Sequence, residues 1–535
     1  MMIALFQYEP SMTVKYSLTF SMFGNVVLGL GSERHFHYYE EALEGKILGC
    51  FALTEISHGS NAKGMRTIAK KFHFSSILFC FFIILGKTAT HAIVYAKLIT
   101  PDGKDHGLHA FVTKIRDPET MLPYEGVTVG DMGHKGGLNG IDNGFVLFDN
   151  YPVDREDLLN KTGDVTPEGE YVTPFKDPNK RIGANFAALS AGRVGIVSIC
   201  LAYMTKAVPI AVRYAATRRQ FGPENKEELP ILEYPLHQWR LIPYLAAAVV
   251  LKNFGEFFSH AIVFQAKLGI EIHTLSSSAK PVAAWITNLA IQESREACGG
   301  HGYLKIAGLC DLREDTDVNA TYEGDNNVLI QQTSNWLLQL WSKRKTPGVF
   351  DFPLGSVTFI ADADKILNSK FTATSVKEAV SPKVLQDAFQ WLICHLLKST
   401  AAKIESLSKK GLDSFSVKNH SQVYLARTLS LVYCEKILER AESVKADDKL
   451  YKILLKVSSL YGAWSLEKHL VTMYQGGYVS GALPATILRD GILDLCSELK
   501  DDAVSLADVI APCDFALNSA LGMSDGEVNF AVCLY

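Results

Sequence analysis

The fold is decided by residues 184–220, which read ANFAALSAGRVGIVSICLAYMTKAVPIAVRYAATRRQ. This stretch is rich in alanine and long apolar residues, so it predicts one long helix with a kink at Pro209. Gly222-Pro223 marks its end, because neither residue readily continues a helix. Further helices are expected at about 233–268, 281–297 and 326–343. Four long helices in succession predict a helical bundle.

The segments on either side of these helices have different patterns. Upstream, short β-rich runs alternate with the turn dipeptides Asp102-Gly103, Asn139-Gly140 and Asn143-Gly144, which predict a small antiparallel β domain. Downstream, helical character resumes from about 364 to 509 and predicts a second helical domain. The expected fold is therefore α+β and mainly α. Its expected parts are the β domain (48–155), the bundle (175–345) and the C-terminal helical domain (360–528).

The composition excludes several classes of protein. The 535 residues include 53 Lys+Arg and 57 Asp+Glu, and the net charge of −4 argues against a nucleic-acid-binding protein. Ten cysteines are scattered without a CxxC pair, so neither a zinc module, another metal site nor a disulfide framework is expected. The most hydrophobic stretch, residues 77–85, is far shorter than the roughly 20 residues of a membrane-spanning helix.

Two motifs place polar groups at a turn or at a helix end. GCFALTEISHGSN (49–61) joins a β-type run to a turn rich in hydroxyls. This turn either holds a polar heterocycle or simply ends a strand. In YAATRRQFG (214–222), Arg218 lies in the last helical turn, where it either complements the helix dipole or binds a phosphate.

Two further motifs lie near the expected helix boundaries. In CGGHGY (298–303), the glycines either cap a helix or let a ligand approach the backbone closely, and His301 alone is weak evidence. In TYEGDNNVL (321–329), Glu323 and Asp325 either complement the dipole of the next helix or supply a general base. None of the four motifs is decisive on its own.

Together, and in this order, the motifs resemble those of the acyl-CoA oxidases, members of the acyl-CoA dehydrogenase superfamily. The resemblance rests on FALTEISHGSN (51–61), RYAATRRQFGP (213–223), EACGGHGY (296–303), TYEGDNN (321–327) and LKDDAVSLADVIAP (499–512). The sequence is most similar to the branched-chain, pristanoyl-CoA type of peroxisomal oxidase in GSERH (31–35), GDVTPEG (163–169), LEYPLHQWRLIPYLAA (232–247) and EGDNNVLIQQTSN (323–335). The resemblance extends from about Ser11 to Val528.

The resemblance implies an activity and a cellular location. An acyl-CoA oxidase converts a branched or long-chain acyl-CoA to a trans-2-enoyl-CoA and reduces O2 to H2O2, as part of peroxisomal fatty-acid β-oxidation. Glu323 matches the catalytic base, which removes the α-proton of the thioester. The cofactor that the resemblance implies is FAD, because in this family a bound flavin carries out the oxidation. The bundle is then the FAD domain, and the expected location is the peroxisome.

The resemblance also implies which residues bind the cofactor. Thr54 matches the residue that hydrogen-bonds the flavin ring. Arg218 and Gln238 match positions that reach the FAD of a neighbouring subunit, which implies a homodimer. Gly299 and Gly300 match the loop that approaches the adenosine end of FAD.

The sequence departs from the family pattern in three places. Only the last helix of an N-terminal helical domain is expected, at about 11–31, so residues 1–47 are interpreted as the remnant of that domain. KKFHFSSILFCFFIIL (70–85) replaces the expected strands and flavin loop at about 70–86, and Ile83 falls where the family has a glycine. The C-terminal NFAVCLY is not an SKL-type peroxisomal signal.

Two alternatives stay open at this point. The first is an acyl-CoA dehydrogenase that passes electrons to a flavoprotein carrier, although most such enzymes lack the second helical domain. The second is a non-catalytic family member that only folds, or pairs with a full-length subunit. The atypical 70–86 segment favours the second alternative.

Overall fold

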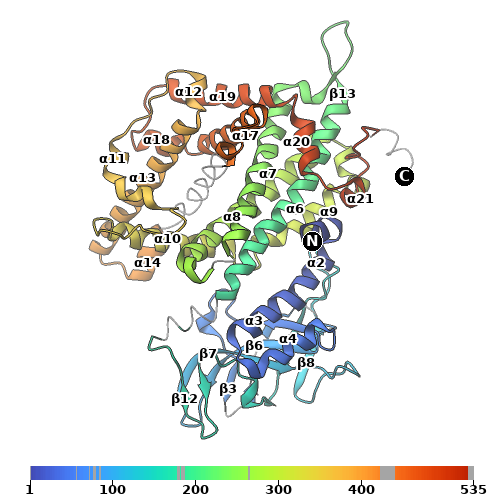
Figure 1. The fold of residues 1–535 in the computed structure, drawn as a ribbon, viewed down its shortest axis with the longest axis vertical. Helices are drawn as coiled ribbons and strands as arrows, with labels where there is room; N and C mark the ends of the chain where they lie inside the picture. Colours follow the sequence, from blue (N-terminus) through green and yellow to red (C-terminus); the bar gives the residue numbers. More distant parts are fainter. Residues whose placement is uncertain are drawn as a thin grey trace. The chain divides into compact units, whose positions relative to one another are not determined.

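The chain divides into two compact units, Met1–Gly192 and Arg193–Tyr535 (Figure 1). The computed structural model describes residues 2–55, 57–70, 73–75, 80–83, 86–177, 181, 187–262, 265–421 and 440–527. Each unit has its own hydrophobic core, so the two are described separately.

The first unit combines short helices with two sheets. Its helices are α1 (Met2–Tyr8), α2 (Pro10–Tyr16), α3 (Phe23–Leu30) and α4 (Phe36–Leu43), with a π-helical segment (Ser17–Met22) between α2 and α3. Its strands are β1 (Gly49–Ala52), β2 (Thr54–Glu55), β3 (Ile68–Lys70), β4 (His73–Ser75), β5 (Cys80–Ile83), β6 (His91–Ile99), β7 (Asp105–Lys114), β8 (Val127–Asp131), β9 (Gly144–Phe148), β10 (Tyr151–Pro152), β11 (Asp164–Val165) and β12 (Tyr171–Val172). The helical backbone from Pro10 to Leu30 occupies the place expected for the 11–31 helix.

Strand β6 is the centre of the first unit, because it is buried on both faces. Val94 on one face shares a core with Val146 of the four-stranded sheet β2-β5-β9-β8. Tyr95 on the other face shares a core with Phe23 of α3. The unit therefore has three layers, in which the six-stranded sheet lies between helices and a second sheet.

Two strand pairings differ from the expected antiparallel domain. β6 pairs antiparallel with β7, but β1 and β3 both pair parallel with β6. Parallel neighbours need a crossover connection, and turn dipeptides reveal only hairpins. The remaining ladders of the two sheets are antiparallel.

The 70–86 segment contributes backbone to both sheets. β4 pairs with β3 and β10, and β5 pairs with β2 and β9. Ile83 lies opposite Gly144 in the β5–β9 ladder. Residues 71–72, 76–79 and 84–85 of the apolar run lie outside the described residues. Strands thus form in the segment where the sequence comparison expects the family's strands to be replaced.

Gly144 is not the turn residue that Asn143-Gly144 predicts. It begins β9, and a Cβ atom there would collide with the backbone of Gly86 and Gly130. The Gly86 amide also donates to the Asp142 carbonyl oxygen at 2.6 Å. These three glycines let two strands and a turn approach more closely than side chains permit.

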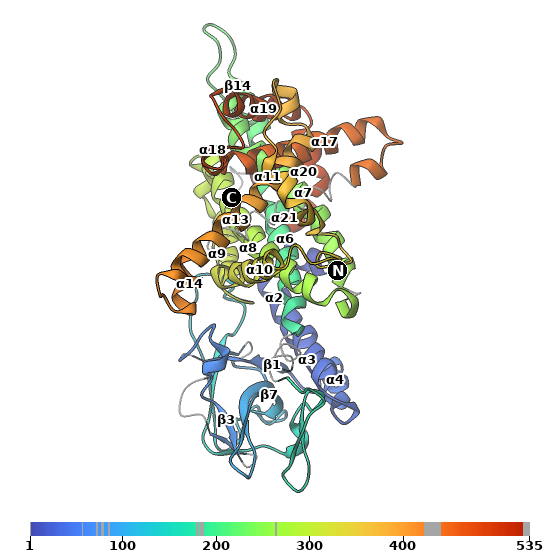
Figure 2. The ribbon, with the colours of Figure 1, turned by 90° about the vertical axis from the view of Figure 1, so that its left-hand side faces the viewer.

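In its described residues, the second unit is helical apart from one hairpin, which connects the end of α6 to the start of α7 and projects from the unit (Figure 2). Its first half contains α6 (Ala187–Thr217), β13 (Arg219–Gln220), β14 (Leu229–Pro230), α7 (Pro235–Ile262), α8 (Gln265–Ala297), α9 (Leu309–Asp317) and α10 (Asn326–Ser342). Its second half contains α11 (Ala363–Asn368), α12 (Val376–Ala379), α13 (Pro382–Lys409), α14 (Ser414–Ser421), α17 (Asp448–Glu467), α18 (Leu470–Gln475), α19 (Leu483–Leu499), α20 (Ala503–Ile510) and α21 (Asp514–Leu517).

The long helices follow the sequence prediction except at the boundary between α7 and α8. α6 continues through Pro209, and α7 and α10 begin within two residues of their expected starts. α7 ends at Ile262 rather than near 268, and α8 begins at Gln265 rather than near 281, with a break at Gly269. The sequence pattern misses its first turns because Pro281 suggests a helix start, yet the helix continues past this proline.

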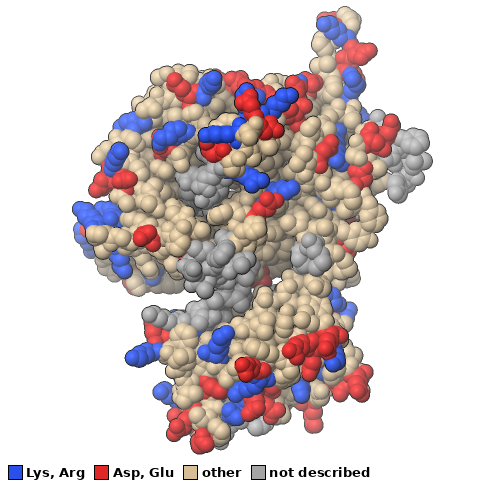
Figure 3. Space-filling model, viewed as in Figure 1, with Lys and Arg blue, Asp and Glu red and all other residues tan. Residues whose placement is uncertain are grey.

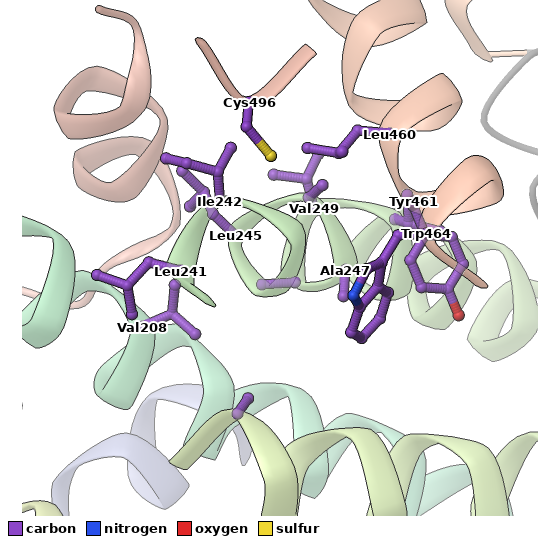
Figure 4. Packing of buried hydrophobic residues seen from close by; sticks show 14 of the residues in the cluster. Val208, Leu241, Ile242, Leu245, Ala247, Val249, Leu460, Tyr461, Trp464 and Cys496 are labelled. Carbon is purple, nitrogen blue, oxygen red and sulfur yellow. The ribbon is translucent and has the colours of Figure 1, made fainter. Parts of the chain in front are cut away.

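One hydrophobic core joins the two halves of the second unit. It contains residues of α6, α7 and α8 together with residues of α13, α17, α19 and α20. Figure 4 shows side chains that converge on it, among them Val208, Leu245, Leu460 and Cys496. The expected bundle and C-terminal domain therefore pack into one compact unit.

Two helices, α6 and α7, are long and apolar enough to cross a membrane by length and composition. Most of each apolar window is buried inside the second unit, 83% for α6 and 72% for α7. Burial in a protein core accounts for their hydropathy.

We expect Gly144→Ala to destabilise the first unit. The new Cβ atom would meet backbone atoms, which cannot move aside as the end of a side chain can. Such overpacking costs about 1–3 kcal/mol, enough to lower the Tm by several degrees. Thermal unfolding measures the change. Gly136→Ala is the control, because its Cβ would meet no atom within 4 Å; equal Tm values for the two variants would contradict the prediction.

Candidate active site

Glu323 lies on a tight turn just before α10. Its φ is 53° and that of Gly324 is 100°, so two consecutive residues have positive φ. Such a conformation costs a non-glycine residue about 1–3 kcal/mol. Asp325 then starts the helix, and its carboxylate accepts the N–H groups of Asn327 at 2.9 Å and Val328 at 3.1 Å. Of the two acidic residues, Asp325 is a helix cap and Glu323 is not.

One oxygen of the Glu323 carboxylate is enclosed and unpaired. Oε2 is buried and has no hydrogen-bond partner among the described residues. Two buried cations donate to the backbone of the same turn. Arg193 Nε of α6 lies 3.4 Å from the Glu323 carbonyl oxygen, and Lys280 Nζ of α8 lies 2.8 Å from that of Gly324. The turn is therefore held from two helices while a carboxylate oxygen stays available.

Burial sets the proton affinities of this site. It raises the pKa of Glu323 to about 7, against the opposing charges of Arg193 and Lys280. It lowers the pKa of Lys280 to about 8. The pKa of His273 is lowered to about 4 by burial and by Arg193, so this imidazole is neutral at neutral pH. A carboxyl group tuned to neutral pH in an enclosed position can act as a general base.

The sequence interpretation missed the two cations. Arg193 also donates to Ser277 Oγ at 3.2 Å and approaches His273 Nδ1 at 3.4 Å. Lys280 also donates to Asn326 Oδ1 at 2.9 Å. The sequence did contain a signal, because Arg193 and Lys280 are each a single charge within an otherwise uncharged helical stretch. Lys and Arg are rarely buried without partners, so each is expected to have a partner.

A second region forms where α6 ends. Tyr214 Oη and His301 Nδ1 are 2.9 Å apart, which joins the last turns of α6 to the loop after α8. The Arg218 carbonyl oxygen accepts the Ile231 N–H at 2.8 Å, which joins it to the segment before α7. The motifs at 214–222 and 298–303 therefore lie in one region.

The glycines of CGGHGY have different surroundings. Gly302 is required for packing, since a Cβ there would collide with the Arg295 carbonyl. Gly299 has a φ of 59°, and a Cβ at Gly299 or Gly300 would meet no atom within 4 Å. The exposed backbone at Gly299 and Gly300 thus offers the close approach that a dinucleotide needs.

Arg218 and Gln238 differ in accessibility. Arg218 is half-buried, and its guanidinium suits a phosphate. Gln238 is buried, and its Nε2 donates to the Leu232 carbonyl oxygen at 3.0 Å. Of the two, Arg218 offers more of its side chain to a ligand.

The structure does not bring Glu323 and Arg218 together. Glu323 lies beside Arg193 near the start of α6, whereas Arg218 follows its end. About 37 Å of helix separates Arg193 from Arg218. One bound dinucleotide therefore cannot contact both groups in the same chain.

Thr54 belongs to the first unit, where it is half-buried in β2. The adjacent Glu55 is buried, and its carboxylate accepts the N–H groups of Arg66 at 2.9 Å and Thr67 at 2.7 Å. This buried carboxylate anchors the turn after β2 to the segment that leads into β3. Thr54 therefore lies next to a fixed turn.

The described part of the chain contains no group of three or more His, Cys, Asp or Glu that could hold a metal ion. On the face drawn in Figure 3, acidic and basic side chains are interspersed.

Comparison with known proteins identifies the family. A family model described as the acyl-CoA oxidase C-alpha1 domain matches residues 186–338, and one described as acyl-CoA oxidase matches residues 381–529. Human peroxisomal acyl-coenzyme A oxidase 3 is 46% identical, over 97% of this chain and 79% of its own length.

Solved structures have the same fold. Acyl-CoA oxidase 1 of Arabidopsis thaliana has a TM-score of 0.88 and 29% identity, over 97% of this chain and 81% of its own. Acyl-CoA oxidase-2 of Caenorhabditis elegans, solved with FAD, ascaroside-CoA and ATP, has a TM-score of 0.86 and 25% identity, over 97% and 78%. These matches confirm the expected fold class and the oxidase interpretation. The chain therefore belongs to the acyl-CoA oxidase family of flavin-dependent oxidoreductases.

Proposed function

We propose that this chain oxidises long-chain or 2-methyl-branched acyl-CoA with FAD as cofactor and Glu323 as catalytic base. The observation that carries the proposal is the Glu323 carboxylate, which has an enclosed, unpaired oxygen and a pKa of about 7. The branched or long-chain substrate is supported by the sequence similarity to the pristanoyl-CoA type of oxidase.

Glu323 removes the α-proton of the thioester in this proposal. A carboxyl group with a pKa near 7 is partly ionised at neutral pH, and it binds the abstracted proton more strongly than an ordinary glutamate. Arg193 and Lys280 orient the turn by holding its carbonyl oxygens. When bound, FAD would supply the hydride acceptor and O2 would take up the electrons, so that the products would be a trans-2-enoyl-CoA and H2O2.

The residues present suit an FAD site. Thr54 offers a hydroxyl beside an anchored turn in the first unit. Arg218 offers a guanidinium for a phosphate, and Gly299 and Gly300 offer open backbone for the adenosine end. Gln238 contributes from its buried position behind Leu232, as a support for this region rather than as an exposed ligand.

We infer that the active form is a homodimer in which Arg218 serves the cofactor of the partner subunit. The separation between the Glu323 and Arg218 regions supports this inference, because one cofactor cannot reach both. Exposed apolar residues also surround the end of α6: Phe221 is 83% exposed, Tyr303 74% and Leu236 73%. Apolar residues of this kind are enriched in protein interfaces.

The division into parts and the location complete the proposal. We propose residues 48–155 as the flavin-facing β domain, 175–345 as the FAD-binding bundle and 360–528 as the C-terminal oxidase domain, after the helices of 1–47. The human relative is named a peroxisomal enzyme, which supports a peroxisomal location for this chain.

Glu323→Gln keeps the shape of the side chain but removes its basicity. We expect turnover to fall by about 10²–10⁴-fold, measured as enoyl-CoA and H2O2 formation. Glu314→Gln, on the exposed surface of α9, is the matched control and should be unaffected. Near-normal turnover by Glu323→Gln would exclude this residue as the base.

The pH dependence follows from the raised pKa of Glu323. The base must be ionised, so kcat/KM should rise with pH through about 7 and level off above it. An unshifted glutamate would instead give a rise near pH 4. A pH–rate profile of the FAD-loaded enzyme distinguishes the two, and a rise centred below pH 5 would contradict the assignment.

Arg218→Ala should weaken FAD binding without unfolding the chain. Loss of a charge-assisted contact to phosphate costs about 1.5–3 kcal/mol, which corresponds to roughly 10–150-fold in Kd. Fluorescence titration of the apoprotein with FAD measures the change, and circular dichroism checks the helices. Arg219→Ala is the control, because the Arg219 side chain donates to the Glu228 carbonyl oxygen at 2.8 Å and is exposed. Equal FAD affinity of the two variants would show that Arg218 is only a helix-end charge.

A further inference from the structure

Lys280 is a wholly buried lysine that binds the turn carrying Glu323. Its Nζ donates to the Gly324 carbonyl oxygen at 2.8 Å and to Asn326 Oδ1 at 2.9 Å. Gly324 belongs to the turn and Asn326 begins α10, so the ammonium spans the junction between them. A buried charge is costly unless it is well paired, and here both partners belong to the segment around Glu323.

The arrangement keeps Glu323 in a conformation that it would otherwise leave. Its φ of 53° is unfavourable for a glutamate, and Lys280 holds the Gly324 carbonyl of the peptide between Gly324 and Asp325. Arg193 contacts the preceding carbonyl, that of Glu323 itself, from a different helix. Two successive carbonyl oxygens are therefore fixed by two buried cations.

We propose that Lys280 is a positioning residue for the Glu323 base, holding its turn through Gly324 and Asn326 and placing a positive charge beside that turn. This inference rests on the proposed role of Glu323. Lys280 contacts the turn, so it is not itself a catalytic residue.

The charges around Lys280 support the second part of the proposal. The groups that act on Lys280 come from the turn and from α6, and they are Glu323, Asp325, Cys200 and Arg193. Burial raises the pKa of Cys200 to about 12, so the thiol is uncharged. At neutral pH, Lys280 and Arg193 are the cations that lower the pKa of Glu323.

Lys280→Met removes the charge and both hydrogen bonds, whereas Lys280→Arg keeps the charge. In Lys280→Met the carboxylate loses a nearby cation, so the pKa of Glu323 rises. The acidic limb of the kcat/KM profile should then move up by about one pH unit, and Lys280→Arg should keep the wild-type limb. Lys468→Met is the control for the loss of a lysine charge elsewhere: Lys468 is exposed, and its Nζ lies over the Trp464 ring at 3.5 Å.

Hydrogen exchange tests the positioning role without turnover. Amides of 321–328 should exchange at least about tenfold faster in Lys280→Met than in the wild type or in Lys468→Met. Unchanged exchange, or a Lys280→Met profile that loses rate at all pH values without moving its acidic limb, would overturn the role of Lys280.

These outcomes are distinct from failure of the proposed base, which would appear as an active Glu323→Gln variant and would overturn both assignments. If Lys280→Met does not fold, Lys280→Arg still tests the proposal. A Lys280→Arg variant whose acidic limb or loop exchange differs from that of the wild type would contradict it.

Discussion

A carboxylate that acts as a base near neutral pH must be taken out of water without being neutralised by a direct ion pair. In this structure, Arg193 and Lys280 meet that constraint by donating to carbonyl oxygens of the turn and leaving Glu323 Oε2 unpaired. The arrangement requires α6, α8 and the start of α10 to pack in a fixed register. A shift of α6 or α8 would move one cation away from its carbonyl.

The proposed base could be predicted from the sequence more readily than the residues that support it. Glu323 was assigned because the continuous motif TYEGDNN resembles that of the acyl-CoA oxidases. Lys280 contacts a turn more than 40 positions away in the chain, and a single lysine in a helix is normally a solvated residue. The residues of a short motif are thus predictable, whereas partners from distant helices depend on packing that periodicity does not encode.

The fold shows the same division between local and distant information. Helix positions follow from apolar length, and the strands near 91–99 and 105–114 follow from their composition and turns. The parallel pairing of β1 and β3 with β6 could not be predicted, since it depends on segments that are far apart in sequence. Gly144 is a similar case, because its lack of a side chain serves contact with Gly86 and Gly130 rather than a local turn.

The shared core of the second unit limits how this chain can evolve. α7 packs against α8 on one side and against α17, α19 and α20 on another, and its Tyr244 ring meets Trp464 edge to face at 5.1 Å. The C-terminal helices therefore cover an apolar face of α7 that would be exposed to water without them. Recombination at the 345–360 connection would leave α7 with an apolar face and no partner. Substitutions in α7 that face α17, α19 or α20 are therefore constrained by the residues that they contact on those helices.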